Sequence, residues 1–204
     1  MSTTAPPVTT DRSDFRTVVT GGTTLGLLTA AGVALYLLVA RSVPGNAARG
    51  GVELVIVIAT GLAAAFLPGR WCEARSVEGI AGAAALGLWG TIVFSVIDIA
   101  LLRPVRAYPW TWDAVGGGTT WWYLPIWWML GTFLAWMGGI RTAAGAARGH
   151  TGLAGLTGPV VAGALVAAAL AKLGGLAVLP PVAAGAGFAL TLAALALLAL
   201  ARQA

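Results

Sequence analysis

Asp98 is the first of the few side chains in this sequence that could do chemistry. It lies near the end of a long apolar run, where a carboxylate costs roughly 2.5 to 3.5 kcal/mol at mid-membrane unless it is paired or close to the interface. Ser95 lies three residues earlier on the same side of a helix, and Arg103 and Arg106 follow one to two turns later. These residues predict either a site for a proton or a polar ligand, or an interfacial carboxylate that is paired with an arginine.

Tryptophans form the second unusual pattern, because seven of the nine lie between residues 103 and 137. Indole and phenol rings favour the headgroup region of a membrane, where an apolar ring and a polar N–H or O–H are both satisfied. The aromatic residues expected to act as such interface anchors are Trp110, Trp112, Trp121, Trp122 and Tyr123. Trp89, Trp128 and Trp136 fall deeper within apolar runs. They either fill gaps between helices or wall a cavity for an apolar ligand such as a quinone, a carotenoid or a lipid tail.

The other reactive side chains are isolated. His150 is the only histidine and Cys72 the only cysteine, which excludes bis-histidine haem ligation, a histidine-based zinc triad and a buried Ser-His-Asp triad supplied by this chain alone. No phosphate-loop, HExxH or GxSxG motif occurs. The sequence therefore predicts no metal site and no resident cofactor, and it favours a non-catalytic role over an enzymatic one.

The elements that must position these residues follow from an extreme composition. Of the 204 residues, 58% are hydrophobic, 29 are glycine and only 9% are charged, and the mean hydropathy is +0.88. A soluble domain usually carries about 25% charged residues, and 12 basic with 7 acidic side chains are too few to cover one of this size. The lipid bilayer must therefore be part of the solvent.

Charges divide the chain into six apolar stretches, each long enough for the roughly 20 helical residues that cross a bilayer. Strand-like alternation is absent from all of them, which favours helices over a barrel. The sequence predicts an all-α, polytopic transmembrane bundle of six helices with short loops, in a single membrane domain over residues 17–204. The spans are expected at about 17–40, 52–71, 79–102, 120–140, 152–171 and 181–201.

The ends of the chain carry two further expectations. Residues 1–16 are rich in Ser, Thr and Pro and predict a disordered tail, while the 24-residue run after them is too long for a cleaved signal peptide and predicts a retained anchor. Six spans place more basic residues on the side of the termini than on the other, seven against five, which favours both termini in the cytoplasm at a bacterial-type inner membrane. The seven are Arg12, Arg16, Arg70, Arg75, Arg141, Arg148 and Arg202.

Small residues recur four apart within the spans, a spacing that lets helices approach closely in lipid. The longest such row lies in the third span, and shorter rows lie in the first, fifth and sixth. The third-span row consists of Gly79, Ala83, Gly87, Thr91 and Ser95, and the others include Gly22, Gly26, Gly155, Gly163 and Gly187. These rows predict the interfaces between helices.

The function that these features favour is that of a non-catalytic binding or accessory component of a membrane complex. Its expected partners are the bilayer, further membrane subunits or a second copy of the chain, and the Trp-rich segment is the expected contact for a lipid, quinone or pigment. Basic residues are spread over the loops, so nucleic-acid binding is not expected. The alternatives are a small proton-coupled transporter that uses Asp98 and an intramembrane enzyme that acts on a lipid.

Overall fold

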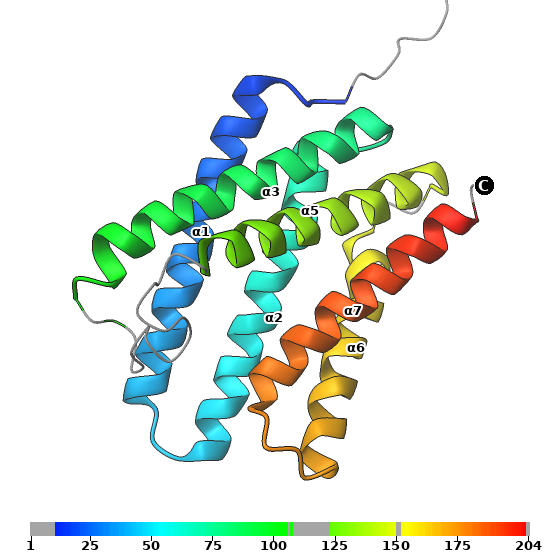
Figure 1. Cartoon of the computed structure of the whole chain (residues 1–204). Helices are drawn as coiled ribbons and strands as arrows, with labels where there is room; N and C mark the ends of the chain where they lie inside the picture. Colours follow the sequence, from blue (N-terminus) through cyan, green and yellow to red (C-terminus); the bar gives the residue numbers. More distant parts are fainter. Residues whose placement is uncertain (1–10, 106, 108–122, 150–151, 203–204) are drawn as a thin grey trace, which may run out of the picture.

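A computed structural model of the chain describes residues 11–105, 107, 123–149 and 152–202 (Figure 1). These residues form six α-helices and contain no strand, which confirms the predicted all-α bundle. The helices are α1 (Phe15–Ser42), α2 (Asn46–Trp71), α3 (Val77–Ile97), α5 (Tyr123–Ala147), α6 (Leu153–Leu173) and α7 (Pro180–Ala201). A π-helical segment, η1 (Asp98–Leu102), continues α3.

Five of these segments, α1, α2, α3 with η1, α6 and α7, are long and apolar enough to cross a membrane. The 25-residue helix α5 occupies the position of the fourth expected span. Large apolar side chains are exposed on all six helices, α5 included, where Met129 is 72% exposed. A surface of this kind suits contact with lipid rather than water.

Local signals set the helix ends. The Asp14 carboxylate accepts hydrogen bonds from the backbone N–H of Thr17 at 3.0 Å and from its hydroxyl at 2.7 Å, and so caps α1. Ser76 caps α3 in the same way. Between α6 and α7 the chain turns at Gly175, whose positive φ of 64° favours glycine, and Pro180 then supplies the first residue of α7.

Residues 1–16 were expected to form a disordered tail, but the last six of them, residues 11–16, are ordered in the structure. The Asp11 carboxylate accepts hydrogen bonds from the Ser76 hydroxyl at 2.5 Å and from the backbone N–H groups of Ser76 and Gly79, both at 2.9 Å. The backbone N–H of Arg12 donates to the Cys72 carbonyl at 2.9 Å. Free N–H groups at the start of α3 therefore fix this segment, and residues 1–10 lie outside the described part of the chain.

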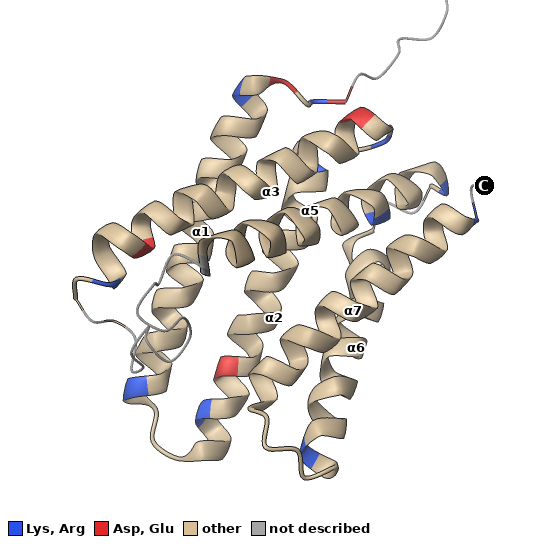
Figure 2. Cartoon of the chain, viewed as in Figure 1, with Lys and Arg blue, Asp and Glu red and all other residues tan. Residues whose placement is uncertain are grey.

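The helices pack as a layer of neighbours around α2. Figure 1 shows α3 and α5 running side by side at a slant to the other helices, with α1 against α3 and with α6 paired with α7. Helix α2 contacts α1, α3, α5 and α7. Figure 2 shows the charged residues near the helix ends, with a broad uncharged zone between them. This distribution is typical of a bundle that crosses a bilayer.

Rows of small residues form the helix crossings, as the sequence predicts. A Cβ on Gly87 of α3 would lie 2.6 Å from the Gly131 carbonyl oxygen of α5, and one on Gly26 of α1 would lie 2.6 Å from the Gly90 oxygen of α3. The expected α6 row behaves differently along its length. A Cβ on Gly163 would collide with Thr191 of α7, whereas Gly155 has no neighbour within 4 Å and faces outward. Only the second half of that row is an interface within the chain.

Candidate functional site

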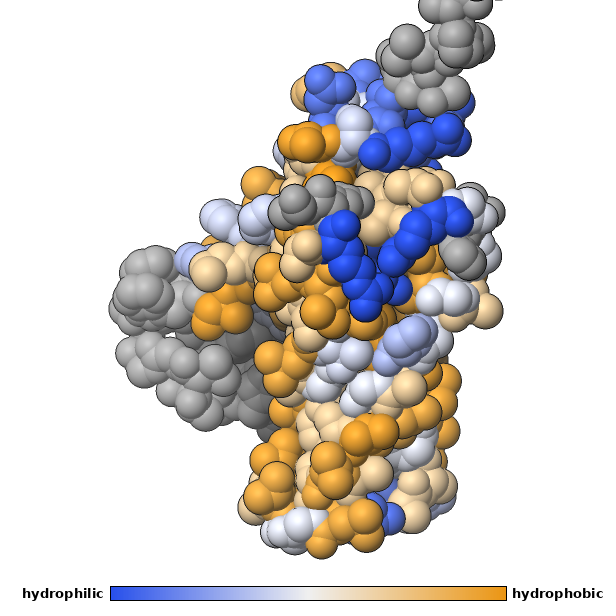
Figure 3. Space-filling model, turned by 90° about the vertical axis from the view of Figure 1, so that its right-hand side faces the viewer, coloured by the Kyte–Doolittle hydropathy of each residue, from blue (hydrophilic) through white to orange (hydrophobic). Residues whose placement is uncertain are grey.

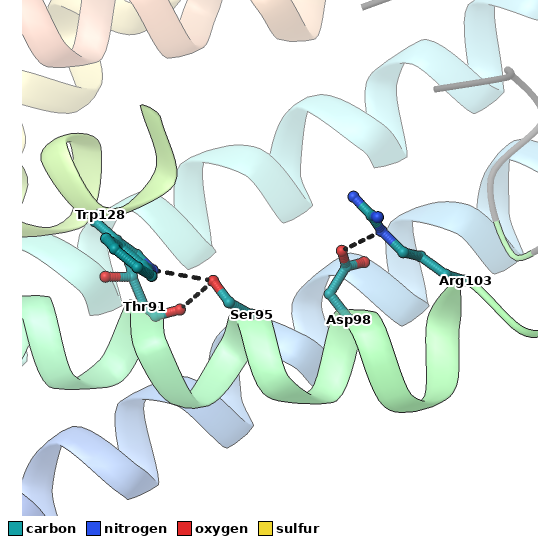
Figure 4. Close-up of polar contacts among 5 residues, drawn as sticks. All are labelled: Thr91, Ser95, Asp98, Arg103 and Trp128. Atoms are coloured by element: carbon teal, nitrogen blue, oxygen red, sulfur yellow. Dashed lines mark hydrogen bonds and ion pairs between the residues drawn. The ribbon is translucent and has the colours of Figure 1, made fainter. Parts of the chain in front are cut away.

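A row of polar side chains runs along the buried face of α3 towards its C-terminal end. Thr91, Ser95 and Asp98 are all buried, and the Ser95 hydroxyl donates to the Thr91 carbonyl oxygen at 2.7 Å. From α5, the indole N–H of Trp128 donates to the Ser95 hydroxyl oxygen at 3.3 Å (Figure 4). The polar row is therefore shared between the neighbouring helices α3 and α5.

Asp98 closes this row and is only 1% exposed. The Nε of Arg103 lies 3.3 Å from its carboxylate Oδ2, so the pair is both an ion pair and a hydrogen bond (Figure 4). The two residues are five apart, a spacing that an α-helix would place on different faces. The π-helical turn η1 begins at Asp98, and the backbone N–H of Arg103 donates to the Asp98 carbonyl at 3.0 Å. This wider turn brings Arg103 over Asp98.

The structure thus brings together three of the four polar residues singled out in the sequence. Ser95 and Asp98 share the α3 row, and Arg103 pairs with Asp98, which is the geometry of the paired interfacial carboxylate. Arg106 lies outside the described residues. Arg41, at the end of α1, donates to the carbonyl oxygen of the buried Ala107 at 2.5 Å and so holds the segment after η1 against α1.

Two of the three deeper tryptophans lie in one groove. Trp128 and Trp136 line a shallow groove of about 320 Å³ on the face formed by α3 and α5. Its other lining residues are Leu88, Met129, Thr132 and Phe133. Trp89 lies elsewhere, because its indole N–H donates to the Thr23 hydroxyl of α1 at 3.1 Å. The three tryptophans therefore do not form one wall.

The expected interface anchors fall almost entirely outside the described residues. Tyr123 begins α5, but Trp110, Trp112, Trp121 and Trp122 belong to the segment 108–122 that the structure does not describe. Their role as anchors stays a prediction.

Glu53 is a buried acidic residue near the start of the second expected span, 52–71. Helix α2 begins at Asn46, six residues earlier than expected, so Glu53 lies about two turns inside the helix and is 8% exposed. Arg49 lies 3.9 Å from its carboxylate, and the Tyr36 side chain of α1 hydrogen bonds to it. The four-residue spacing of Arg49 and Glu53 was the available signal, since such pairs meet on one helix face.

Cys72 is completely buried where α2 ends. Burial, with a smaller effect of the nearby carboxylates of Asp11 and Asp14, raises the pKa of its thiol to about 11. The thiol is therefore protonated at neutral pH, and it is a poor nucleophile. Its neighbourhood also contains a hollow of about 250 Å³, lined by Arg70 at the end of α2, by Glu73 and Arg75 of the following loop and by Thr142 of α5, among others.

The described residues contain no cluster of three or more His, Cys, Asp or Glu side chains that could hold a metal ion. No protein-family model, no curated protein and no solved structure matches the chain. The functional inference therefore depends on the polar row, the tryptophan groove and the distribution of charge.

Proposed function

We propose that the protein is a non-catalytic component of the membrane that binds the apolar chain of a lipid, quinone or pigment in the groove of Trp128 and Trp136. The main support for this proposal is the groove and the residues that line it. Its two indoles lie eight residues apart on α5, roughly 12 Å along the helix axis. Two planar indoles and the adaptable side chain of Met129, which also lines the groove, offer a long apolar chain a large contact area.

The polar row of α3 indicates that the ligand is amphiphilic, with a polar head as well as an apolar chain. Trp128 lies at the end of the groove that is nearer to Ser95. Asp98, which pairs with Arg103, follows Ser95 by about one turn. A ligand that lays its chain against Trp136 and Trp128 would direct its polar head towards η1, where the helix approaches the membrane surface. This arrangement matches an apolar chain with a small hydrogen-bonding head.

The test compares one substitution on two faces of the bundle. Trp136→Leu removes a wall of the groove, while Trp89→Leu makes the same change on the face towards α1. After gentle extraction, mass spectrometry should find an apolar molecule bound to the wild type and to Trp89→Leu. Trp136→Leu should retain about tenfold less, the equivalent of roughly 1.4 kcal/mol of lost contact. Equal retention by both variants, or a wild type that carries no such molecule, would contradict the proposal.

The proposal extends to the setting of the protein. We place it in a bacterial-type inner membrane as an accessory component of a larger complex, with both termini in the cytoplasm. The support for the orientation is the excess of basic residues on the side of the termini. Purification without detergent, in native nanodiscs, would test the complex, because co-purifying membrane chains are expected and a lone monomer is not.

A further inference from the structure

The last three helices of the protein carry positive charge and no negative charge. Within the 204 residues, no Asp or Glu follows Asp113, whereas Arg141, Arg148, Lys172 and Arg202 do. Helices α5, α6 and α7 therefore supply no acidic partner to one another. Any carboxylate side chain that pairs with these cations must come from the first half of the 204 residues or from another molecule.

Three of these cations gather at one end of the bundle. Arg141 lies in the last two turns of α5, Arg148 directly follows that helix, and Arg202 directly follows α7, which packs against α5. The charges of both Arg148 and Arg202 act on the Arg141 guanidinium. Figure 2 shows basic but no acidic positions at the C-terminal ends of α5 and α7, and Figure 3 shows hydrophilic surface there above a broad apolar band.

The described part of the protein does not neutralise this cluster. The Nε of Arg141 is buried and has no hydrogen-bond acceptor among the described residues. The Nε of Arg148 donates to the carbonyl oxygen of Ala144 in the last turn of α5 at 3.0 Å. At the same end of the bundle, Glu73 pairs with Arg12 at 3.0 Å and Asp11 is bonded to the start of α3. The cluster is thus suited to an anion that the protein does not supply.

The depth of the three residues indicates what kind of anion this is. Arg141 lies seven residues before Arg148, roughly 10 Å deeper along the axis of α5, and its long stem can direct the guanidinium towards the surface. Leu197 and Leu198 of α7 are exposed just below Arg202, where they could contact acyl chains. A guanidinium also matches the geometry of a phosphate group, with two parallel hydrogen bonds.

We infer that Arg141, Arg148 and Arg202 bind the phosphodiester headgroup of an anionic phospholipid. The site is separate from the tryptophan groove and does not depend on the function proposed for that groove. Phosphate chemistry is shared by lipid headgroups and free phosphate. The lipid is favoured because Arg141 lies about two turns inside the end of α5 and because the exposed Leu197 and Leu198 of α7 shortly precede Arg202.

The experiment measures binding of dioleoylphosphatidylglycerol and dioleoylphosphatidylcholine to the purified full chain by native mass spectrometry. Two double variants each remove two positive charges. Arg141→Gln with Arg148→Gln acts on the cluster, and Arg16→Gln with Lys172→Gln acts on exposed cations elsewhere. The wild type should prefer phosphatidylglycerol, and the cluster variant should bind it about 25-fold more weakly, at about fivefold per arginine. The matched control should change little.

Further arms make every outcome decisive. Should the glutamine variant fail to fold, raising the salt from 0.05 to 0.5 M must weaken phosphatidylglycerol binding to the wild type, and Arg141→Lys with Arg148→Lys must keep most of it. Equal affinity for both lipids, or equal loss in both double variants, would overturn the inference. Competition by millimolar inorganic phosphate would assign the cluster to free phosphate, and occupation by the carboxylate of a co-purifying protein would assign it to a partner chain. Either result would also overturn the lipid assignment.

Discussion

At the scale of single residues, the pair of Asp98 and Arg103 decides how a carboxylate can lie inside an apolar helix. A charge that leaves water loses several kcal/mol of solvation free energy. At Asp98, the attraction of the partly exposed Arg103 guanidinium at 3.3 Å offsets much of that loss. Each member of the pair is acceptable in this position because the other is present. The loss of one member should therefore cost more than the loss of both.

A double-mutant cycle tests this coupling. Asp98→Asn leaves the Arg103 charge without its carboxylate, so we expect it to lower the free energy of unfolding by about 3 kcal/mol. Adding Arg103→Gln should recover part of that loss. Unfolding by sodium dodecyl sulfate in mixed micelles measures the stability of Asp98→Asn, of Arg103→Gln and of the double variant. Additive losses would contradict the coupling, and unchanged stability with a lost response to a pH gradient in transport assays would favour the transporter alternative.

Cys72 gives a prediction of chemical protection. Its thiol is buried, and its pKa is raised from 9.0 to about 11, so its thiolate fraction at neutral pH is roughly 100-fold below that of an unperturbed thiol. We expect no maleimide labelling of the folded protein at pH 7.4 and full labelling after denaturation. A cysteine at Val77, which is 81% exposed, placed in a Cys72→Ala background, is the reactive control. Rapid labelling of native Cys72 would contradict the structure at this end of α2.

At the scale of elements, backbone contact between helices depends on glycine. A Cβ on Gly138 of α5 would collide with the Ala65 carbonyl of α2, whereas a Cβ on Gly158 of α6 would meet nothing within 4 Å. A backbone carbonyl cannot rotate away as a side chain can. The α2–α5 crossing is therefore fixed by one residue without a side chain.

The two glycines form a matched pair for mutagenesis. Gly138→Ala should lower the free energy of unfolding by about 3 kcal/mol, because the helices must separate to admit the methyl group. Gly158→Ala should leave stability unchanged or raise it by up to about 1 kcal/mol through its higher helix propensity. The micelle unfolding assay measures both. A harmless Gly138→Ala would show that α2 and α5 do not cross this closely.

The contact of residues 11–13 with the start of α3 joins two elements and depends on pH. Burial raises the pKa of Asp11, but hydrogen bonds from Ser76, Arg75 and Gly79 outweigh it and hold the pKa below its usual value of 3.8. The folded state therefore binds this proton less tightly than the unfolded state. The stabilisation is fully present above pH 3.8 and disappears as the pH falls through the lowered pKa of the folded protein.

Asp11→Ala should lower the free energy of unfolding by about 1 kcal/mol at pH 7, as expected for the loss of a helix cap. Its difference from the wild type should shrink as the pH falls below 3.8. Arg12→Gln removes only the exposed ion pair with Glu73 and should change stability by less than about 1 kcal/mol. A difference between Asp11→Ala and wild type that stays constant down to pH 2 would exclude a role for the carboxylate charge.

At the scale of the whole molecule, the antiparallel order of the helices predicts which loops share a side of the membrane. The loops after α2 and α5 lie at one end of the bundle, and the loops after α1 and α6 lie at the other (Figure 1). This alternation requires α5 to cross the membrane together with the five segments of higher hydropathy.

Single cysteines in a Cys72→Ala background test that crossing. Cysteines at Val77 and Ala147 should be labelled by an impermeant maleimide from one side of the membrane, and cysteines at Asn46 and Leu176 from the other. These positions are all exposed. Labelling of Val77 and Ala147 from opposite sides would show that α5 does not span the bilayer and would reduce the count to five.

The sequence by itself determined the class of the protein and most helix positions. Whether a stretch of residues prefers a bilayer depends on its own length and summed hydropathy, so the expected spans 52–71 and 181–201 end where α2 and α7 end. The row from Gly79 to Ser95 was also readable, because small residues four apart share a helix face whatever lies opposite. These properties are local, and they need no knowledge of neighbours.

Only the tertiary structure decided which side chains meet. Arg103 reaches Asp98 through a π-turn that no residue pattern marked, and Trp128 and Trp136 share a groove that excludes Trp89. Asp11 became ordered because the start of α3, 65 to 68 residues later in the chain, offered free N–H groups. Contacts of this kind depend on how helices cross and rotate against each other, and that arrangement is set by packing of the whole bundle rather than by the hydropathy of any one segment.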